Sequence, residues 1–273
     1  MQAAPIGVFD SGVGGLSVLR ALKALLPHED FIYLGDTARL PYGTKSAQSV
    51  VRYSLQCAAA LVGRRIRCLV VACNTASASS LPALRQHYPD LPVVGVIEPG
   101  AQAAVAASVS QRIAVIGTEG TILGGAYRSA IESLNPGAEV RSVACSLFVA
   151  LAEEGWTSGS IPEAIARRYL DELFTEEHGA PDTLVLGCTH FPALLEPIRA
   201  VLPAGVRIVD SAGTTAAAVR AQLPDARQGD SAGRVTFLAT DGAARFARVG
   251  SRFLGETLSA EAVEIVDLNQ ASA

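Results

Sequence analysis

The chain has 273 residues, of which 49% are apolar and 18% charged, and its formal net charge is −4. This length suits two α/β domains of about 100 to 150 residues each, and the charge argues against a nucleic-acid partner. Apolar runs end well before the ~20 residues that cross a membrane, and no signal-peptide pattern opens the sequence. We therefore expect a cytoplasmic protein, without membrane contact, whose five cysteines are free thiols.

Short β-rich runs alternate with helical patterns through the first part of the chain. Leu19, Leu22 and Leu26 recur at helical spacing, while Arg20 and Lys23 fall on the other side, which predicts one stripe packed on a sheet. The strand-like runs are apolar without alternation, which indicates a buried parallel sheet. Strands are expected at 6–9, 31–34, 68–72 and 92–97, and helices at 14–26, 46–63, 78–88 and 100–107.

The second part repeats this order. Strands are expected at 112–117, 139–145, 183–187 and 206–210, and helices at 120–134, 161–177, 193–202 and 212–223. Three segments match between the parts at offsets of 107, 115 and 114 residues. Offsets this similar indicate an ancient duplication with small changes of loop length. The matching segments are IGVFDSGVGG with IAVIGTEGTI, LVVACNTAS with LVLGCTHFP, and VVGVIEPGA with RIVDSAGTT.

The end of the chain has no partner in the second part. A polar, turn-rich segment at 224–233 precedes a strand-helix-strand pattern, which we expect to return to the first sheet. The predicted fold is α/β, with two similar βα lobes, mostly parallel sheets and an active site in the cleft between the lobes. The first lobe is predicted at 1–97 plus 208–273, and the second at 98–207.

One cysteine occupies the same point in each half of the duplication. Cys73 and Cys188 each follow an apolar strand and precede a helix, where ligands bind in open α/β sheets and where the helix N-terminus favours a thiolate. Two thiols facing each other suit racemisation, which needs a base on one face of a carbon atom and an acid on the other. The alternatives are buried apolar cysteines, as expected for Cys57, Cys68 and Cys145, or a zinc site with His190.

A glycine-rich loop follows the first predicted strand. Asp10 and Ser11 end that strand, where Ser11 is placed to hold a carboxylate and Asp10 to accept from an ammonium group or polarise a thiol. Both residues are also ordinary helix caps. The spacing of Gly12, Gly14 and Ser17, with Asp36 about 20 residues on, leaves a dinucleotide site as an alternative, although Ser17 stands where Gly or Ala is wanted.

Other polar residues occur at strand ends or beside the second cysteine. Asp36 closes the second strand before a Pro41-Tyr42-Gly43 loop that is suited to close over an amino acid. His190 and Glu153 are candidates to tune the Cys188 thiol. Each residue also has a purely structural alternative. Asp36 would be an ordinary strand-end cap, His190 a hydrogen-bonded histidine at the start of a helix, and Glu153 a solvent-exposed glutamate.

Five segments between Phe9 and Pro192 resemble the glutamate racemase family as a set: FDSGVGGLSVLRAL, YLGDTARLPYG, VACNTASA, VIEPG and LGCTHFP. The resemblance implies interconversion of L- and D-glutamate without pyridoxal phosphate, metal or any other cofactor. It also implies a supply of D-glutamate for peptidoglycan, and a homodimer.

The resemblance assigns roles by motif. Cys73 is implied to act on the D-enantiomer and Cys188 on the L-enantiomer. Ser146 and Ala150 stand where the family usually has proline, which loosens the loop leading to Glu153. Asp10, Asp36, Glu153 and His190 match positions that assist the thiols, and the residues implied to bind substrate are Asp10, Ser11, Tyr42, Gly43, Asn74, Thr75, Thr189 and His190.

Other functions fit parts of the same pattern. An aspartate or hydantoin racemase would share both thiols, whereas a related decarboxylase would need only one. From a different class, the chain fits a two-lobed amino-acid sensor or a racemase-like regulator of DNA gyrase. A pure binding protein has no need of two thiols.

Overall fold

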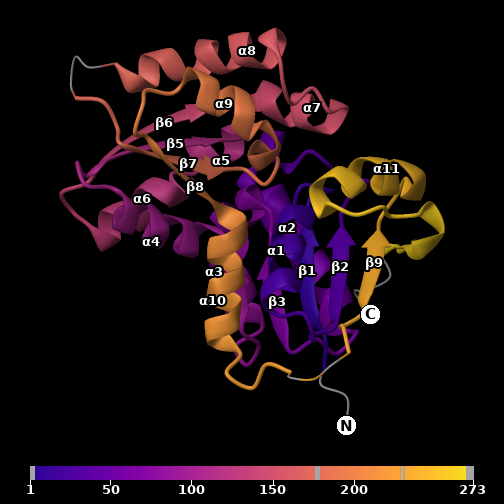
Figure 1. The fold of residues 1–273 in the computed structure, drawn as a ribbon. Helices are drawn as coiled ribbons and strands as arrows, with labels where there is room; N and C mark the ends of the chain where they lie inside the picture. The colour runs from indigo at the N-terminus through magenta and orange to yellow at the C-terminus, as the bar shows by residue number, and fades with distance from the viewer. Residues whose placement is uncertain (1–3, 176–178, 228, 230, 269–273) are drawn as a thin grey trace.

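The computed structural model describes residues 4–175, 179–227, 229 and 231–268. It contains two parallel sheets, one in each of two lobes (Figure 1). The first has the strand order β10-β9-β2-β1-β3-β4, and the second has the order β6-β5-β7-β8. The predicted α/β class is confirmed. The strands are β1 (Ile6–Asp10), β2 (Phe31–Gly35), β3 (Cys68–Val71), β4 (Val93–Gly95), β5 (Arg112–Gly117), β6 (Glu139–Ala144), β7 (Thr183–Gly187), β8 (Arg207–Asp210), β9 (Val235–Ala239) and β10 (Val263–Ile265).

The two sheets repeat one strand order. In the first, β1 lies between β2 and β3, with β4 beyond β3; in the second, β5 lies between β6 and β7, with β8 beyond β7. All of these pairs are parallel. The equivalence agrees with the duplication seen in the sequence, and it makes β3 and β7 counterparts. Cys73 and Cys188 therefore follow equivalent strands.

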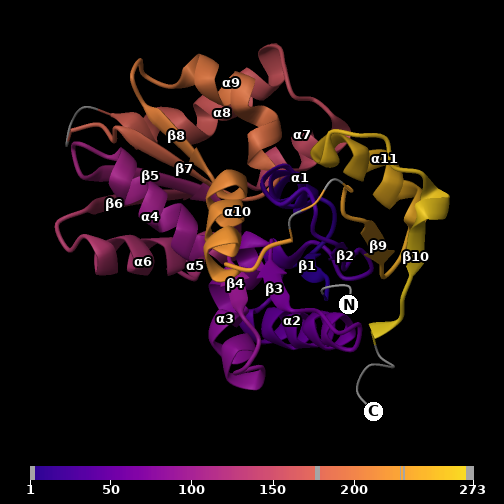
Figure 2. The same ribbon diagram turned by 60° about the horizontal axis from the view of Figure 1, so that its bottom comes forward.

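Helices cover the faces of both sheets (Figures 1 and 2). In α1, Leu19 and Leu22 are buried and Arg20 is exposed, as the apolar stripe predicts. The helices are α1 (Leu16–Leu25), α2 (Ala47–Val62), α3 (Asn74–His87), α4 (Ile97–Ala107), α5 (Glu119–Leu123), α6 (Ala126–Leu134), α7 (Ser146–Glu154), α8 (Ser160–Leu170), α9 (Leu195–Val201), α10 (Ser211–Gln222) and α11 (Ala243–Leu254), with short 3-10 turns at Tyr42–Thr44, Asp171–Phe174, Phe191–Leu194 and Ala260–Ala262.

Several predicted boundaries need correction. In the first lobe, α3 begins at Asn74 and not at 78, and the strand expected at 92–97 ends at Gly95. The lobe boundary at 207/208 falls inside β8, which pairs with β7 as far as Asp210, where the Asp210 side chain caps α10. The single helix expected at 120–134 is broken into α5 and α6 because Gly125 adopts φ +64°, a left-handed conformation that ends a helix. The helix expected at 161–177 ends at Leu170 and continues only as a 3-10 turn; its last residues, 176 and 177, lie outside the described residues.

The C-terminal strands return to the first lobe. β9 pairs with β2, and β10 pairs with β9, so the first sheet has six strands where the second has four. Between β9 and β10, α11 lies on the side of the first lobe that faces α7 of the second (Figure 2). No helix within the described ranges is long and apolar enough to cross a bilayer.

Candidate active site

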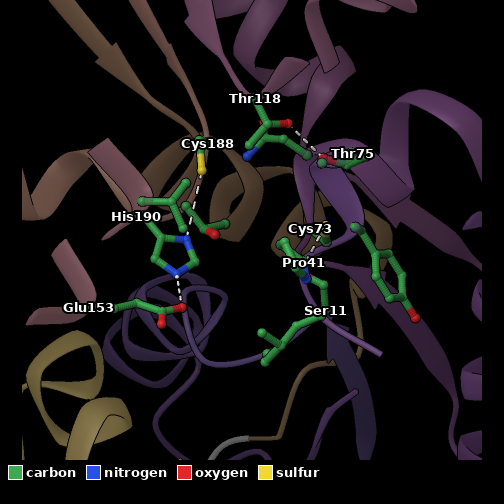
Figure 3. Close-up of a pocket in the computed structure, with 15 residues that line it drawn as sticks. Ser11, Pro41, Cys73, Thr75, Thr118, Glu153, Cys188 and His190 are labelled. Carbon is green, nitrogen blue, oxygen red and sulfur yellow. Dashed lines mark hydrogen bonds and ion pairs between the residues drawn. The ribbon is translucent and has the colours of Figure 1, made fainter. Parts of the chain in front are cut away.

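A narrow cavity of about 50 Å³ lies between the lobes, at the carboxyl ends of both sheets. Figure 3 shows Cys73 and Cys188 on opposite sides of it. Thirteen of its fifteen lining residues lie in or beside the motifs singled out from the sequence. The cavity is lined by Ser11, Gly12, Leu40, Pro41, Tyr42, Gly43, Cys73, Asn74, Thr75, Thr118, Val149, Glu153, Cys188, Thr189 and His190.

Cys73 is the N-cap of α3. Its sulfur accepts a hydrogen bond from the Ala76 N–H at 3.4 Å and lies 3.6 Å from the Ser11 hydroxyl. Burial, together with the negative charge of Asp10, raises the pKa of Cys73 to about 12, although the two hydrogen bonds act in the opposite direction. In this environment Cys73 is a thiol at neutral pH and has a proton to give.

Cys188 has a different neighbour. Its sulfur lies 3.8 Å from Nδ1 of His190, whose Nε2 lies 3.2 Å from Oε1 of Glu153. Burial alone would lower the pKa of His190, but hydrogen bonds to Cys188 and Glu153 and the charges of Cys188 and Asp10 raise it to about 10. A cationic imidazole this close interacts more favourably with a thiolate than with a thiol. The cavity therefore has a thiol on one side, and on the other a cysteine whose sulfur lies beside a cationic histidine.

Glu153 remains a carboxylate beside this histidine. Burial acts to raise its pKa, but hydrogen bonds from His190 and Arg245 lower it to about 2. Its side chain is 15% exposed. The structure thus brings Glu153 into the site, on α7, although the sequence departs from the family's prolines nearby.

Asp10 lies behind the cavity lining. It is fully buried, and its Oδ2 accepts the Gly12 N–H at 3.0 Å, while Oδ1 has no hydrogen-bond partner among the described residues. Burial raises its pKa, against the opposing effects of His190 and of backbone N–H groups. Asp10 does not line the cavity, so it acts on Cys73 through its charge.

The glycine loop packs against the second lobe, which leaves no room there for a dinucleotide. A Cβ atom at Gly14 would lie 2.4 Å from Oγ1 of Thr189 and 2.5 Å from the His190 ring. Ser17, the residue that fits the dinucleotide pattern poorly, donates to the carbonyl of Gly14 at 2.8 Å and lies 3.3 Å from the carbonyl of Thr189. This loop is a contact between the lobes.

Asp36 is also placed outside the cavity lining. It is buried, and it accepts hydrogen bonds from Arg39 Nε at 2.7 Å, from the Thr240 hydroxyl at 3.0 Å and from the hydroxyl of Tyr42. Burial strongly raises the pKa of Tyr42, so its hydroxyl keeps its proton and donates. Asp36 therefore holds the loop whose residues Pro41, Tyr42 and Gly43 line the cavity.

Hydrogen-bond donors gather beside Cys73. The side-chain oxygen of Asn74 accepts from the Tyr127 hydroxyl at 2.8 Å, but its buried Nδ2 has no partner among the described residues. The Thr75 hydroxyl lies 2.9 Å from that of Thr118. Together with the N-terminus of α3, these groups suit a carboxylate. Thr189, opposite, is buried and also lines the cavity.

Three lining residues and one charged neighbour were missed from the sequence, whereas Gly12 belongs to the glycine-rich loop expected to approach a ligand. Thr118 was recoverable, because the duplication aligns it with Ser11. Leu40 and Val149 carry no chemical signal of their own. Arg245, which contacts Glu153, comes from the C-terminal segment without a duplicated counterpart.

The remaining cysteines behave as predicted. Cys57, Cys68 and Cys145 are buried free thiols outside the cavity lining, and burial raises the pKa of each. Among the described residues, no three His, Cys, Asp or Glu side chains are grouped in the way a metal site requires.

Comparison with known proteins gives consistent matches over nearly the whole chain. Residues 6–221 match the Asp/Glu/hydantoin racemase family model. Glutamate racemase of Geobacter metallireducens is 53% identical over 260 residues, covering 93% of each chain. The crystal structure of Francisella tularensis glutamate racemase with D-glutamate superposes with a TM-score of 0.90 at 35% identity, covering 99% of this chain and 100% of that one. The Thermus thermophilus enzyme with β-chloro-D-alanine gives a TM-score of 0.86 at 41% identity, covering 98% of this chain and 99% of that one.

The His190 environment predicts a pH-dependent contribution to stability. Because its pKa is raised from an ordinary 6.5 to about 10, protonated His190 stabilises the fold fully below pH 6.5, and this contribution is lost as the pH rises through about 10. Urea unfolding should therefore show the largest loss from His190→Gln at about pH 6 and a smaller one near pH 10. Exposed His87→Gln is the control, and a loss that grows with pH would contradict the assignment.

Proposed function

This chain belongs to the Asp/Glu/hydantoin racemase family, and on that basis we propose that it is a glutamate racemase in which two thiols exchange the Cα proton of the substrate. One observation carries the proposal: Cys73 and Cys188 line one cavity from opposite lobes, Cys73 beside the Ser11 hydroxyl and Cys188 beside His190. Racemisation needs this arrangement, because the proton must leave one face of Cα and arrive on the other.

The reaction from L- to D-glutamate uses the two thiols once each. The Cys188 thiolate, beside protonated His190, takes the Cα proton and becomes a thiol. The Cys73 thiol then gives its proton to the opposite face of Cα and becomes a thiolate. Proton exchange with water restores the starting states, and the reverse reaction exchanges the two roles. Both steps are general acid-base catalysis by groups held on either side of the carbon.

The polar lining supports an amino-acid dicarboxylate as substrate. Several hydrogen-bond donors in the lining can bind carboxylates: Nδ2 of Asn74, the hydroxyls of Ser11, Thr75 and Thr189, and the N-terminus of α3. The carboxylate of Asp10, one layer behind, attracts the substrate ammonium group. Glutamate is the substrate in the names of the similar enzymes, and D-glutamate occupies one of their structures.

The proposal extends to the cellular role that family membership implies. The chain needs no pyridoxal phosphate or metal, supplies D-glutamate for peptidoglycan in the cytoplasm, and works as a homodimer. Glutamate racemases that match over more than nine-tenths of the chain support this extension.

Racemisation by the purified protein is the direct test. Circular dichroism should show L-glutamate, in buffer without added cofactor, decaying to zero optical activity, while L-aspartate keeps its signal. We expect this selectivity because the aspartate side chain is one methylene shorter, which changes the reach of its second carboxylate when Cα lies between the thiols. Racemisation of aspartate at the same rate as glutamate would favour the aspartate racemase alternative. Absence of activity toward both amino acids would contradict the proposal.

Serine variants test the two thiols separately. Cys73→Ser and Cys188→Ser should each lower kcat for glutamate racemisation by at least about 10²-fold, because a hydroxyl at its ordinary pKa is a poor acid or base for this proton. Cys68→Ala is the control, since Cys68 is buried at the start of β3, the strand that Cys73 follows, and lies outside the cavity lining. Parent-like kcat in either serine variant would contradict a two-thiol mechanism.

A further inference from the structure

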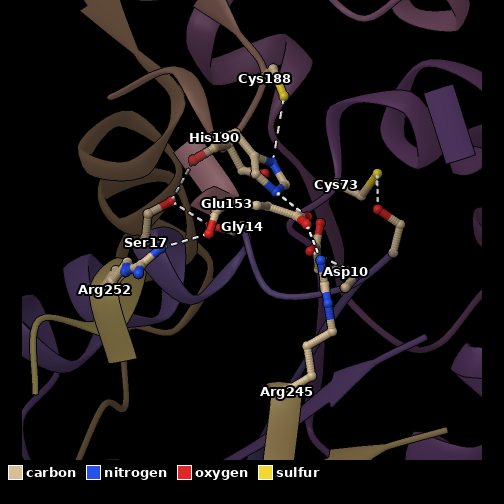
Figure 4. A network of polar contacts seen from close by, with 12 residues as sticks. Asp10, Gly14, Ser17, Cys73, Glu153, Cys188, His190, Arg245 and Arg252 are labelled. Carbon is tan, nitrogen blue, oxygen red and sulfur yellow. Dashed lines mark hydrogen bonds and ion pairs between the residues drawn. The ribbon is translucent and has the colours of Figure 1, made fainter. Parts of the chain in front are cut away.

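One helix of the first lobe reaches across to the Glu153-His190 pair of the second. From α11, Arg245 Nη2 donates to Oε2 of Glu153 at 2.8 Å, and Arg252 Nη1 donates to the Glu153 backbone carbonyl at 2.6 Å (Figure 4). The ring of Phe253 packs edge-on against His190, with ring centres 5.0 Å apart. Arg245 and Arg252 are seven residues apart, two helical turns, and so share one face of α11.

The two carboxylate oxygens of Glu153 have separate partners. Oε1 faces Nε2 of His190, and Oε2 faces Arg245. With one oxygen held by each partner, rotation of the carboxylate about its own axis is restricted, and the imidazole stays aimed at Cys188. The Arg245 side chain is 47% exposed, so its ion pair contributes little to folding stability. The contact between Arg245 and Glu153 instead orients the Glu153 carboxylate, and through it the imidazole of His190.

We propose that Arg245 is a positioning residue for proton transfer at Cys188: it fixes Glu153, which fixes His190, which is in contact with the Cys188 sulfur. The proposal rests on the racemase function given above. Because Arg245 and Glu153 belong to different lobes, their contact is made only when the lobes are together as in this structure. The alignment at Cys188 therefore depends on this contact between the lobes.

The effect should be confined to one of the two thiols. Cys73 is held by Ser11 and the Ala76 N–H, with Asp10 behind it, and no arginine takes part in these contacts. The titratable groups that act on His190 are Cys188, Glu153 and Asp10. Of these three, only Glu153 forms an ion pair with Arg245.

A reaction that uses one thiol at a time separates the two sides. With β-chloroalanine, a thiolate takes the Cα proton while chloride leaves Cβ, and the resulting aminoacrylate hydrolyses to pyruvate and ammonium. No acid on the opposite face is needed. Cys73→Ser and Cys188→Ser, tested on both enantiomers, identify which enantiomer each thiol serves.

Arg245→Gln should then slow elimination from the Cys188-dependent enantiomer by at least about 10-fold, since a ~1 Å misplacement can cost up to about 10²-fold. Elimination from the Cys73-dependent enantiomer should stay within about twofold of the parent. Arg248→Gln is the matched control: it removes the same charge from an exposed position on the same helix. Arg245→Lys should recover part of the loss, because it restores the ion pair with one donor.

The outcomes separate this proposal from the function on which it rests. Equal losses for the two enantiomers, or no loss for either, in a parent protein that racemises glutamate would overturn the positioning role alone. A parent protein that neither racemises glutamate nor eliminates chloride would contradict the racemase function itself.

Discussion

The proposed reaction requires two sulfur atoms to reach one carbon atom from opposite sides, and the close approach of the two lobes makes this feasible. Proton transfer needs reacting atoms within about 3 to 3.5 Å of each other. At Gly14 and Gly43 the backbone of the first lobe comes so near the second that a Cβ atom would lie within 2.7 Å of its side chains. Both glycines lie in loops that carry lining residues. The same contacts that bring the lobes together therefore shape the cavity.

Duplication supplies matching backbone positions, and the side chains then make the two sides different. Cys73 and Cys188 follow the equivalent strands β3 and β7. Burial and the charge of Asp10 favour the thiol form of Cys73. The sulfur of Cys188 instead lies beside His190, whose pKa is raised and which contacts Glu153. The two thiols therefore have different neighbours, and Arg245 of α11 adds one more on the Cys188 side.

The sequence revealed the parts of the fold and site that depend on local pattern. Cys73 and Cys188 were found because strand, cysteine and helix recur at a constant offset, and the glycine and Pro41 loops because turn residues follow strands. Asp10 and Asp36 were expected to assist the thiols, and the structure places both behind the residues that line the cavity. A position at the end of a strand shows which edge of the sheet a residue occupies. It does not show whether the side chain reaches the cavity or lies one layer behind it. The contact of Arg245 could not be predicted from local pattern, because its partner Glu153 is 92 residues away in the sequence and belongs to the other lobe.

If different thiols remove and return the proton, the isotope at Cα of the first product formed will reveal it. L-glutamate is incubated with the parent protein in D2O, and the Cα hydrogen of each enantiomer is followed by NMR and mass spectrometry during the first few per cent of conversion. Because the thiols exchange their protons with solvent, two-thiol transfer predicts D-glutamate that is deuterated at Cα from the start, beside L-glutamate that is still protiated. D-glutamate that retains the original hydrogen would mean that one group both removes and returns the proton, which rules out transfer by two thiols.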